Sequence, residues 1–375
     1  MVAEKTILVF GGYGGAGSAI SRAVLEYTDA DLIVAGRREE EARALAEGLN
    51  AKFPGGRAAW ARADASDSAT LKEPFGKADL VVDAATTVPF VEETARAALE
   101  AGADYLEIHY PQEVVSALAL VAPEAEAAGI TLVTQGGFLP GLPSVLVRWA
   151  ETQFSEYWRA RVYVAMRSDF DPGGAVDEFV GTLGDLSAEV FGGGRWRRAG
   201  RGDVRKVDFG PTLGTKTTYP ITLAEVRDLP QELGVEELSV SVAGLNWFVD
   251  YVVTPLAFAL GRVKKGFGRR PLARLMVFGS KRFGEAGEAV AAVLEAEGEK
   301  GGERVAVRLR VGHDDVYEFT AMPVAAFLRQ YLDGLEIDGL GRPGLSFMGR
   351  VVDPVRFLKD LEDMGAKVEV ELRGV

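Results

Sequence analysis

The sequence has no cysteine and only two histidines, His109 and His313, among its 375 residues. Disulfides and thiolate nucleophiles are therefore excluded, and no H-x-x-x-H or Cys–His spacing offers a metal site. The motifs G-x-S-x-G and the P-loop are also missing, which argues against an α/β-hydrolase with a nucleophilic serine and against a P-loop nucleotide hydrolase. Because no signal peptide precedes the first predicted strand, we expect a reducing, cytoplasmic location.

Positive charges are outnumbered, with 42 Lys or Arg against 55 Asp or Glu, and their distribution is uneven. The formal net charge is −13, which argues against general binding to nucleic acid. Residues 191–282 nevertheless contain 16 Lys or Arg against 8 Asp or Glu, a local excess of 8. A chain of 375 residues is too long to fold around one ordinary hydrophobic core, so we expect two domains.

Glycine is abundant, and its spacing near the start is informative. An apolar run, Thr6–Phe10, leads into G-x-G-x-x-G and then into residues with helical periodicity. In such a strand–turn–helix the three glycines make a tight turn, admit a pyrophosphate to the backbone and allow close packing of helix on strand. The predicted dinucleotide cradle consists of Gly12, Tyr13, Gly14, Gly15, Ala16 and Gly17.

The end of the second predicted strand, Asp31–Gly36, indicates which dinucleotide binds. An NAD site usually places a carboxylate there for the ribose 2′-hydroxyl, whereas this chain has Arg37 and Arg38. Guanidinium groups pair with a 2′-phosphate, so NADP is favoured over NAD. The alternative is that both arginines are solvated residues at the start of the helix Glu39–Leu49.

Two further strand ends supply candidate cofactor contacts. Asp64 follows the short strand 58–62, where it could contact the adenine or serve as a turn residue. The small residues Ala85 and Thr86 follow the apolar strand Asp79–Asp83, where they would let the cofactor pass close to the backbone.

Strand and helix patterns alternate six times up to residue 134. This alternation is typical of an α/β, Rossmann-type, doubly wound parallel sheet, which we assign to residues 1–145. Strand patterns beyond it, including Ala160–Met166 and Glu303–Val311, predict a second α+β domain with a largely antiparallel sheet over residues 146–335. We expect this domain to bind a small-molecule substrate and to form a homodimer.

Several segments together resemble the saccharopine dehydrogenase-like NAD(P)-binding family. They are GGYGGAG, DLVVDAATTVPF, GADYLEIHY and GITLVTQGGFLPGLPSVL, followed near the C-terminus by GLSFM and VDPVRFL. The resemblance implies that residues 336–375 return to the first domain and that a helix starting at Gly173-Gly174 lies beside the substrate. The chain departs from the family at Glu107 and Leu139, where the family has Asp.

Acid–base candidates are few. Strand alternation places Tyr105, Glu107 and His109 on one face of the predicted fifth strand. An imidazole titrates near neutral pH and a carboxylate can hold its tautomer, so these three form the candidate catalytic group. The alternative is that they are hydrogen-bonded structural residues. His313 is interpreted as a turn residue.

These observations predict an NADP-dependent oxidoreductase that transfers hydride at a C–N (imine or amine) or C=O centre. Two alternatives stay open: a reductase of a hydrophobic or lipid-like ketone or enoyl substrate, and a non-catalytic NADP-binding regulatory protein. The segment 247–270 is also open to two interpretations. Its apolar part, 247–260, is too short to span a bilayer, and it either forms a buried or dimer-facing helix or makes a peripheral contact with a membrane or lipid.

Overall fold

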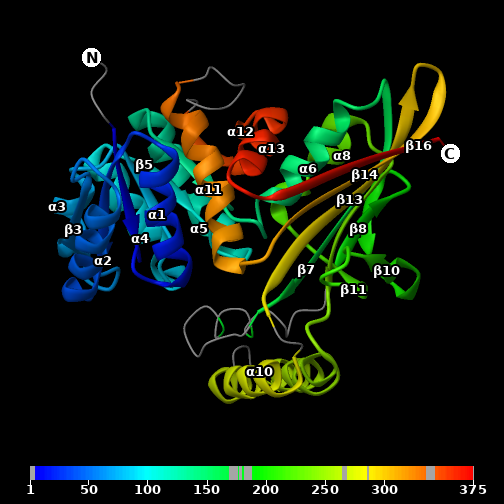
Figure 1. Cartoon of the computed structure of the whole chain (residues 1–375), viewed down its shortest axis with the longest axis horizontal. Helices are drawn as coiled ribbons and strands as arrows, with labels where there is room; N and C mark the ends of the chain where they lie inside the picture. Colours follow the sequence, from blue (N-terminus) through cyan, green and yellow to red (C-terminus); the bar gives the residue numbers. More distant parts are fainter. Residues whose placement is uncertain are drawn as a thin grey trace. The chain divides into compact units, whose positions relative to one another are not determined.

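The computed structural model describes residues 5–168, 176, 180, 188–263, 268–284, 287–334 and 343–374. The chain divides into two compact units, each with its own sheet (Figure 1). The first unit comprises residues 1–142 and 320–364, and the second comprises residues 143–319 and 365–375.

The first unit is built on seven parallel strands in the order β15-β6-β5-β4-β1-β2-β3. The central strands are apolar and buried, as expected for a parallel sheet covered on both faces. This confirms the predicted doubly wound fold and adds a seventh strand from near the C-terminus. The strands are β1 (Thr6–Phe10), β2 (Asp31–Gly36), β3 (Ala58–Arg62), β4 (Leu80–Asp83), β5 (Asp104–Glu107), β6 (Thr131–Thr134) and β15 (Gly344–Phe347).

Helices connect these strands, and two of them end at a glycine. Gly102 and Gly129 adopt left-handed φ values of 77° and 75° after α4 and α5, which terminates both helices. The helical elements of the first unit are α1 (Gly15–Tyr27), α2 (Glu39–Lys52), η1 (Ser68–Thr70), α3 (Lys72–Phe75), η2 (Val88–Phe90), α4 (Val91–Ala101), α5 (Glu113–Ala128), α11 (Val316–Leu332), α12 (Met348–Val351) and α13 (Pro354–Asp363), and α6 (Leu142–Glu151) begins the second unit.

The second unit contains a nine-stranded sheet, in which β12 and β7 pair in parallel and the remaining pairs are antiparallel. The predicted largely antiparallel sheet is therefore confirmed. Its strands are β7 (Glu156–Arg167), β8 (Glu189–Gly192), β9 (Arg195–Arg198), β10 (Arg205–Asp208), β11 (Thr215–Ile221), β12 (Glu237–Ala243), β13 (Ala289–Lys300), β14 (Glu303–His313) and β16 (Lys367–Gly374). Short helical elements are η3 (Arg201–Asp203), η4 (Ala224–Val226), α8 (Leu229–Leu233), η5 (Val249–Val253), α9 (Thr254–Val263) and α10 (Arg269–Phe283).

The predicted helix of this unit is described only in part. The helix expected to start at Gly173-Gly174 lies mostly outside the described residues, as do both glycines, and residues 189–192 form strand β8. β8 and β9 form a hairpin. Gly193 and Gly194 turn it with φ values of 63° and 78°, a conformation that glycine adopts readily.

The C-terminal segment 336–375 divides between the two units. β15 extends the parallel sheet beside β6, and α12 and α13 follow it in the first unit. The last strand, β16, pairs instead with β14 in the second sheet over Lys367–Gly374. Alternating apolar and charged residues in that strand suit the edge of an antiparallel sheet.

Within the ranges given above, no helix combines the length and apolar character needed to cross a membrane.

Arg57 provides a stability test of the first unit. Its guanidinium donates hydrogen bonds to three backbone carbonyl oxygens, of Leu25 (2.6 Å), Thr28 (2.9 Å) and Ala30 (2.8 Å), around the end of α1. We expect Arg57→Ala to lower the free energy of unfolding by about 2–3 kcal/mol, because hydrogen bonds from a charged donor are lost. Urea unfolding followed by circular dichroism measures this; a midpoint no lower than that of the exposed-site control Lys77→Ala would contradict it.

Candidate cofactor and catalytic site

The glycine turn after β1 is fixed by backbone hydrogen bonds. Gly11 and Gly12 N–H groups donate to the carbonyl of Ala35 at 2.8 and 3.2 Å, and Gly14 N–H donates to Gly11 at 2.9 Å. Gly11 adopts φ 76°, and a Cβ there would lie 2.6 Å from the Cα of Ala85. Sequence reasoning missed Gly11, although it is the glycine immediately after the strand.

Two of the three predicted motif glycines, Gly12 and Gly17, leave no room for a side chain. A Cβ on Gly17 would lie 2.1 Å from the carbonyl oxygen of Gly11, and one on Gly12 would lie 2.8 Å from that of Val9. Gly14 is the N-cap of α1 and offers no side-chain hydrogen bond to the first turn. The helix N-terminus therefore presents backbone N–H groups suited to a phosphate. Tyr13, Gly15 and Ala16 complete the turn.

Cationic side chains gather beyond the end of β2. Arg37 and Arg38 are exposed; Arg38 forms an ion pair with Glu41 at 2.7 Å and lies 5.0 Å from the ring of Tyr13. Arg62, at the end of β3, is exposed and pairs in register with Gly36. Sequence reasoning missed Arg62, which its position at the adjacent strand end would have indicated.

Asp64 has a turn role in the structure. It accepts hydrogen bonds from the hydroxyl (2.8 Å) and the N–H (3.0 Å) of Ser66. These bonds lower the pKa of Asp64, and the charges of Arg37 and Arg62 lower it further. The turn alternative therefore describes what Asp64 does here.

The residues present fit a phosphorylated dinucleotide. The turn leaves backbone space that any side chain would fill, and a helix N-terminus follows it. Arg37, Arg38 and Arg62 supply positive charge where NAD sites usually hold a carboxylate.

A buried network centres on Asp83, the last residue of β4. Its Oδ2 accepts hydrogen bonds from the hydroxyls of Thr87 and Tyr105, both at 2.7 Å, with the Thr94 hydroxyl at 3.3 Å. Its Oδ1 accepts from the N–H of Ala85 at 3.1 Å. Burial raises the pKa of Tyr105 well above its ordinary value, and the charge of Asp83 adds to this. Tyr105 is therefore a hydrogen-bond donor throughout the working pH range.

Glu107, the last residue of β5, is likewise buried and bonded. Its Oε1 accepts hydrogen bonds from the Thr134 hydroxyl and from Gln135 N–H, the latter at 2.9 Å. Its Oε2 lies 2.9 Å from Nδ1 of His109. The structure therefore brings Glu107 and His109 together as predicted, and Thr134 and Gln135 at the end of β6 were missed.

His109 connects the two carboxylates. Its Nε2 lies 2.9 Å from the carbonyl oxygen of Ala85 and 3.1 Å from the hydroxyl oxygen of Thr87. Both ring nitrogens thus face oxygen atoms, an arrangement that a doubly protonated ring satisfies. The Thr87 hydroxyl also bonds to Asp83, so hydrogen bonds run continuously from Glu107 through His109 and Thr87 to Asp83.

The exposure of these groups limits what they can do. The His109 side chain is 3% exposed and that of Glu107 is 0% exposed. Thr86, in the loop after β4, is exposed, and Ala85 is half-buried. The network can therefore fix the loop at the carboxyl end of β4 and hold or relay a proton within it.

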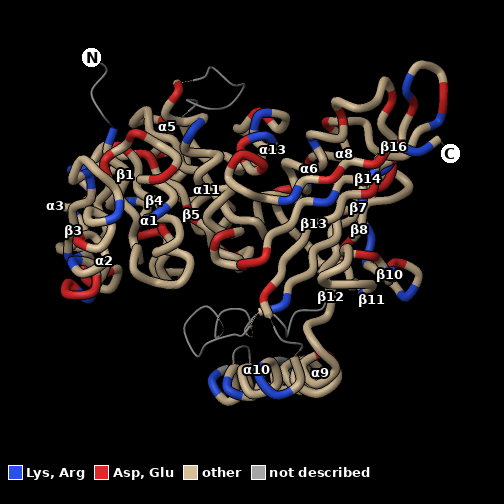
Figure 2. The backbone as a smooth tube through the Cα atoms, viewed as in Figure 1, with Lys and Arg blue, Asp and Glu red and all other residues tan. Residues whose placement is uncertain are grey.

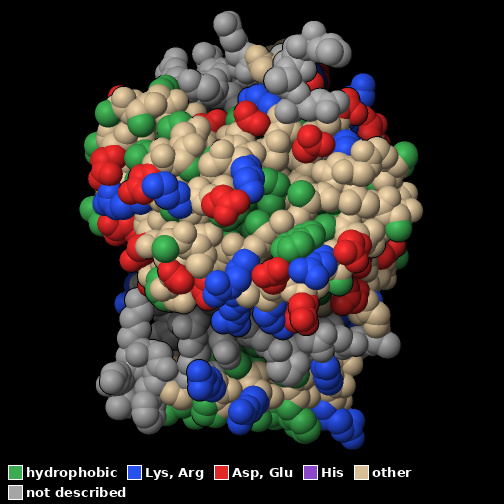
Figure 3. Space-filling view, turned by 90° about the vertical axis from the view of Figure 1, so that its left-hand side faces the viewer, with side chains coloured by type: hydrophobic (Ala, Val, Ile, Leu, Met, Phe, Trp, Pro, Cys, Tyr) green, Lys and Arg blue, Asp and Glu red, His purple; other side chains and the backbone are tan. Residues whose placement is uncertain are grey.

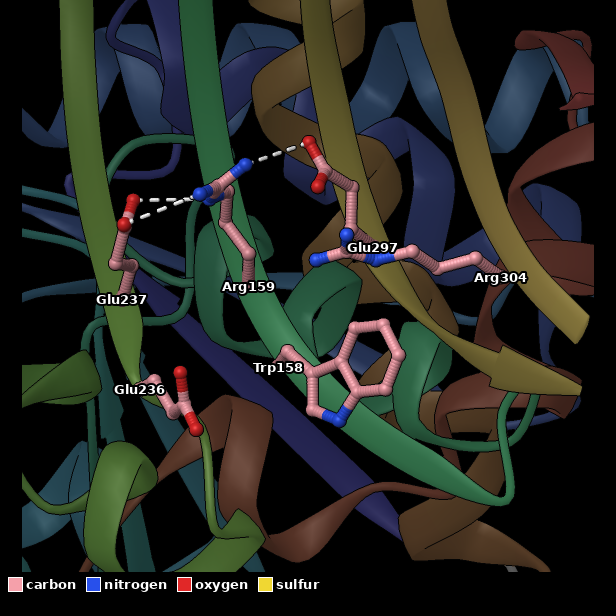
Figure 4. A pocket seen from close by; sticks show the side chains of 6 residues that line it. All are labelled: Trp158, Arg159, Glu236, Glu237, Glu297 and Arg304. Carbon is pink, nitrogen blue, oxygen red and sulfur yellow. Dashed lines mark hydrogen bonds and ion pairs between the residues drawn. The ribbon is translucent and has the colours of Figure 1, made fainter. Parts of the chain in front are cut away.

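A shallow pocket on the second sheet is lined largely by charged side chains, several of which pair with one another (Figure 4). Arg159 bonds to Glu237 at 2.9 and 3.1 Å and to Glu297 at 2.8 Å, and Arg304 lies 5.0 Å from the ring of Trp158. Hydrogen bonding to Arg159 lowers the pKa of Glu237. These mutual contacts link the neighbouring strands β12, β7 and β13. In the described part of the chain, no cluster of three His, Asp or Glu could hold a metal ion.

Gly17 tests the cradle. We expect Gly17→Ala to weaken NADPH binding more than tenfold, because its Cβ would displace the carbonyl of Gly11 and with it the turn. NADPH fluorescence titration measures the effect, with folding checked by circular dichroism. Gly48→Ala is the matched control, because a Cβ on that helical glycine meets nothing within 4 Å; equal affinity for the two variants would contradict the assignment.

Comparisons with known proteins agree with this geometry. Residues 7–133 match the family model described as the saccharopine dehydrogenase NADP binding domain. Among solved structures, apo saccharopine dehydrogenase (L-Glu forming) from Saccharomyces cerevisiae is similar over 99% of this chain and 100% of its own, with a TM-score of 0.71 and 14% identity. This likeness shows a shared fold.

Two weaker similarities involve an engineered D-amino acid dehydrogenase bound to NADP+ and an oxidoreductase domain protein from Kribbella flavida. Their TM-scores are 0.49 and 0.41, with 13% and 18% identity, covering 96% and 84% of this chain and 99% and 77% of theirs. A comparison with curated proteins finds no match. Residues 7–133 are therefore similar to the NADP binding domain of saccharopine dehydrogenase, and the chain shares the fold of the yeast enzyme.

Proposed function

We propose that this protein is an NADP-dependent oxidoreductase that transfers hydride at a C–N or C=O centre of a small-molecule substrate. The observation that carries the proposal is the glycine turn of β1–α1 with positive charge beyond the end of β2. The match of residues 7–133 to an NADP-binding domain supports it. The reaction at a C–N centre follows the resemblance to saccharopine dehydrogenase.

Different residues of the first unit would bind different parts of the cofactor. Gly12, Gly14 and Gly17 would let the pyrophosphate reach the N-terminus of α1. Arg37 and Arg62 would bind the 2′-phosphate, and Arg38 would join them by exchanging its pairing with Glu41. When bound, the nicotinamide supplies the hydride chemistry.

His109 would donate or accept the proton that is exchanged in the reaction. Glu107 holds Nδ1 of the ring, and Thr87 links Nε2 to Asp83, so the ring orientation is fixed. A proton could move between His109 and the Asp83–Tyr105 pair through the Thr87 hydroxyl. Tyr105 would act as a positioning residue, because its hydroxyl contacts Asp83.

A non-catalytic NADP-binding regulatory protein is the second candidate. The observation that favours it is the burial of His109, whose ring nitrogens are both within hydrogen-bond distance of protein oxygen atoms. In this alternative the network would only shape the loop after β4. A reductase of a hydrophobic ketone or enoyl substrate is favoured by Leu139, which replaces an Asp of the family motif.

The cofactor preference is tested with the double variant Arg37→Gln/Arg38→Gln. We expect NADPH affinity to fall about 10- to 100-fold and NADH affinity to change less than about threefold, because only the 2′-phosphate loses charge-assisted hydrogen bonds. Isothermal titration of both nucleotides gives the two ratios. Equal losses for both nucleotides, or tighter binding of NADH by the unaltered protein, would show that the arginines do not read the 2′-phosphate.

The catalytic proposal is tested by NADPH oxidation over a panel of oxo-acids with amines, and of lipid ketones and enoyl compounds. We expect His109→Gln to lower kcat about 100-fold or more and Glu107→Gln to lower it less, with NADPH affinity nearly unchanged. His313→Gln is the control, because His313 ends β14 in the second unit and its Nδ1 accepts a hydrogen bond from the N–H of Asp315. Unchanged rates in His109→Gln would remove His109 from the reaction. Absence of turnover with every substrate would favour the regulatory alternative.

A further inference from the structure

A helical hairpin projects from the second sheet and has a core of its own. It consists of residues 245–263, which include η5 and α9, and residues 268–284, which include α10 (Figure 1). Its inward side chains pack with Val176 and Val180 into one apolar cluster, to which the hairpin contributes Val249, Val253, Ala257, Leu272, Ala273, Met276 and Val277. The hairpin is therefore a packed element, and its outward side chains have defined positions.

The outward face of η5 and α9 is apolar. Trp247, Tyr251 and Leu256 are 53%, 72% and 42% exposed, and Val252 is 38% exposed. Pro255 and Ala259 are the other exposed positions described from 247 to 260, so no charged side chain stands on this part of the face. Neighbouring exposed apolar side chains of this size mark an interaction surface.

The outward face of α10 is cationic. Arg270, Arg274, Lys281 and Arg282 are exposed, and Phe278 is 54% exposed among them. Their spacing of about one helical turn places them on one side of the helix. The described parts of the hairpin contain six Lys or Arg and a single acidic residue, Asp250.

Aromatic rings join the two faces. The ring centroid of Phe283 lies 4.9 Å from that of Trp247 and 5.0 Å from that of Phe248. The ring centroid of Phe278 lies 6.1 Å from those of both Phe248 and Phe283. The apolar and cationic faces are thereby held as one surface. Figure 3 shows green hydrophobic side chains along the lower edge of the molecule with blue Lys and Arg side chains beside them, and Figure 2 shows several blue segments along α10.

We propose that this hairpin is a membrane-binding surface that lies in the interface of a bilayer rich in anionic phospholipid. The exposed apolar and aromatic side chains between Trp247 and Ala259 would enter the boundary between headgroups and acyl chains, and the cations of α10 would contact the phosphates. Charge favours this occupant over a second copy of the chain. A two-fold symmetric contact would place the same cationic face against itself.

The test is flotation of the full-length protein with vesicles of phosphatidylcholine alone and of phosphatidylcholine containing about one-third phosphatidylserine. We expect binding to the anionic vesicles that weakens as salt is raised, because the electrostatic part of the attraction is screened. Arg270→Gln/Arg274→Gln should lower the partition coefficient about 25-fold, since each cation near an anionic surface contributes a factor of about five. Tyr251→Ser/Leu256→Ser should lower it about tenfold or more.

Matched controls change the same residue types elsewhere. Leu120→Ser removes an apolar side chain that is 64% exposed on α5, and Lys72→Gln/Lys300→Gln removes two exposed cations. Both should leave vesicle binding unchanged. Three outcomes would overturn the proposal: no flotation with either vesicle, equal flotation with both, or a self-association in sedimentation velocity that Tyr251→Ser/Leu256→Ser abolishes without any vesicle binding.

Discussion

The close approach of the β1–α1 turn to the end of β4 is the contact on which the rest of the site depends. Gly11 has room for no side chain, because a Cβ would meet the backbone of Ala85 at 2.6 Å. Ala85 in turn donates its N–H to Asp83 and lies with its carbonyl oxygen 2.9 Å from His109. The predicted phosphate cradle and the buried acid–base network therefore share one residue.

Burial of two carboxylates beside an imidazole would be unfavourable without compensation. Each carboxylate accepts several hydrogen bonds, Asp83 from the side chains of β5 and α4 and Glu107 from the end of β6. These bonds offset the cost of desolvation and tie three adjacent strand ends together. The hydrogen bonds that fix the network also connect its titratable groups, which supports the proposed proton route.

The sequence predicted most of the first unit because parallel strands and their helices carry local signals. Apolar runs, helix-ending glycines at 102 and 129, and the G-x-G-x-x-G spacing each depend on neighbouring residues only. β15 was missed as a strand of the sheet because its pairing with β6 joins residues about 210 apart. No local pattern reports such a long-range contact.

The site was predicted in part for the same reason. Tyr105, Glu107 and His109 belong to one strand and its extension, so alternation found them together. Asp83, Thr87 and Thr134 come from other strand ends, and only the sheet order brings them to the same place. Arg62 was missed because its relation to Gly36 is a matter of register between β2 and β3.

We propose that the glycine cradle and the His109 network respond together when the cofactor binds, because both contact Ala85. Nuclear magnetic resonance of protein labelled with 15N at its two histidines tests it, by following the ring nitrogens as NADP+ is added. We expect the ring-nitrogen signals of His109 to change and to saturate with NADP+ binding, while the signals of His313 stay constant. Saturated binding without any change at His109, or no binding of NADP+, would contradict it.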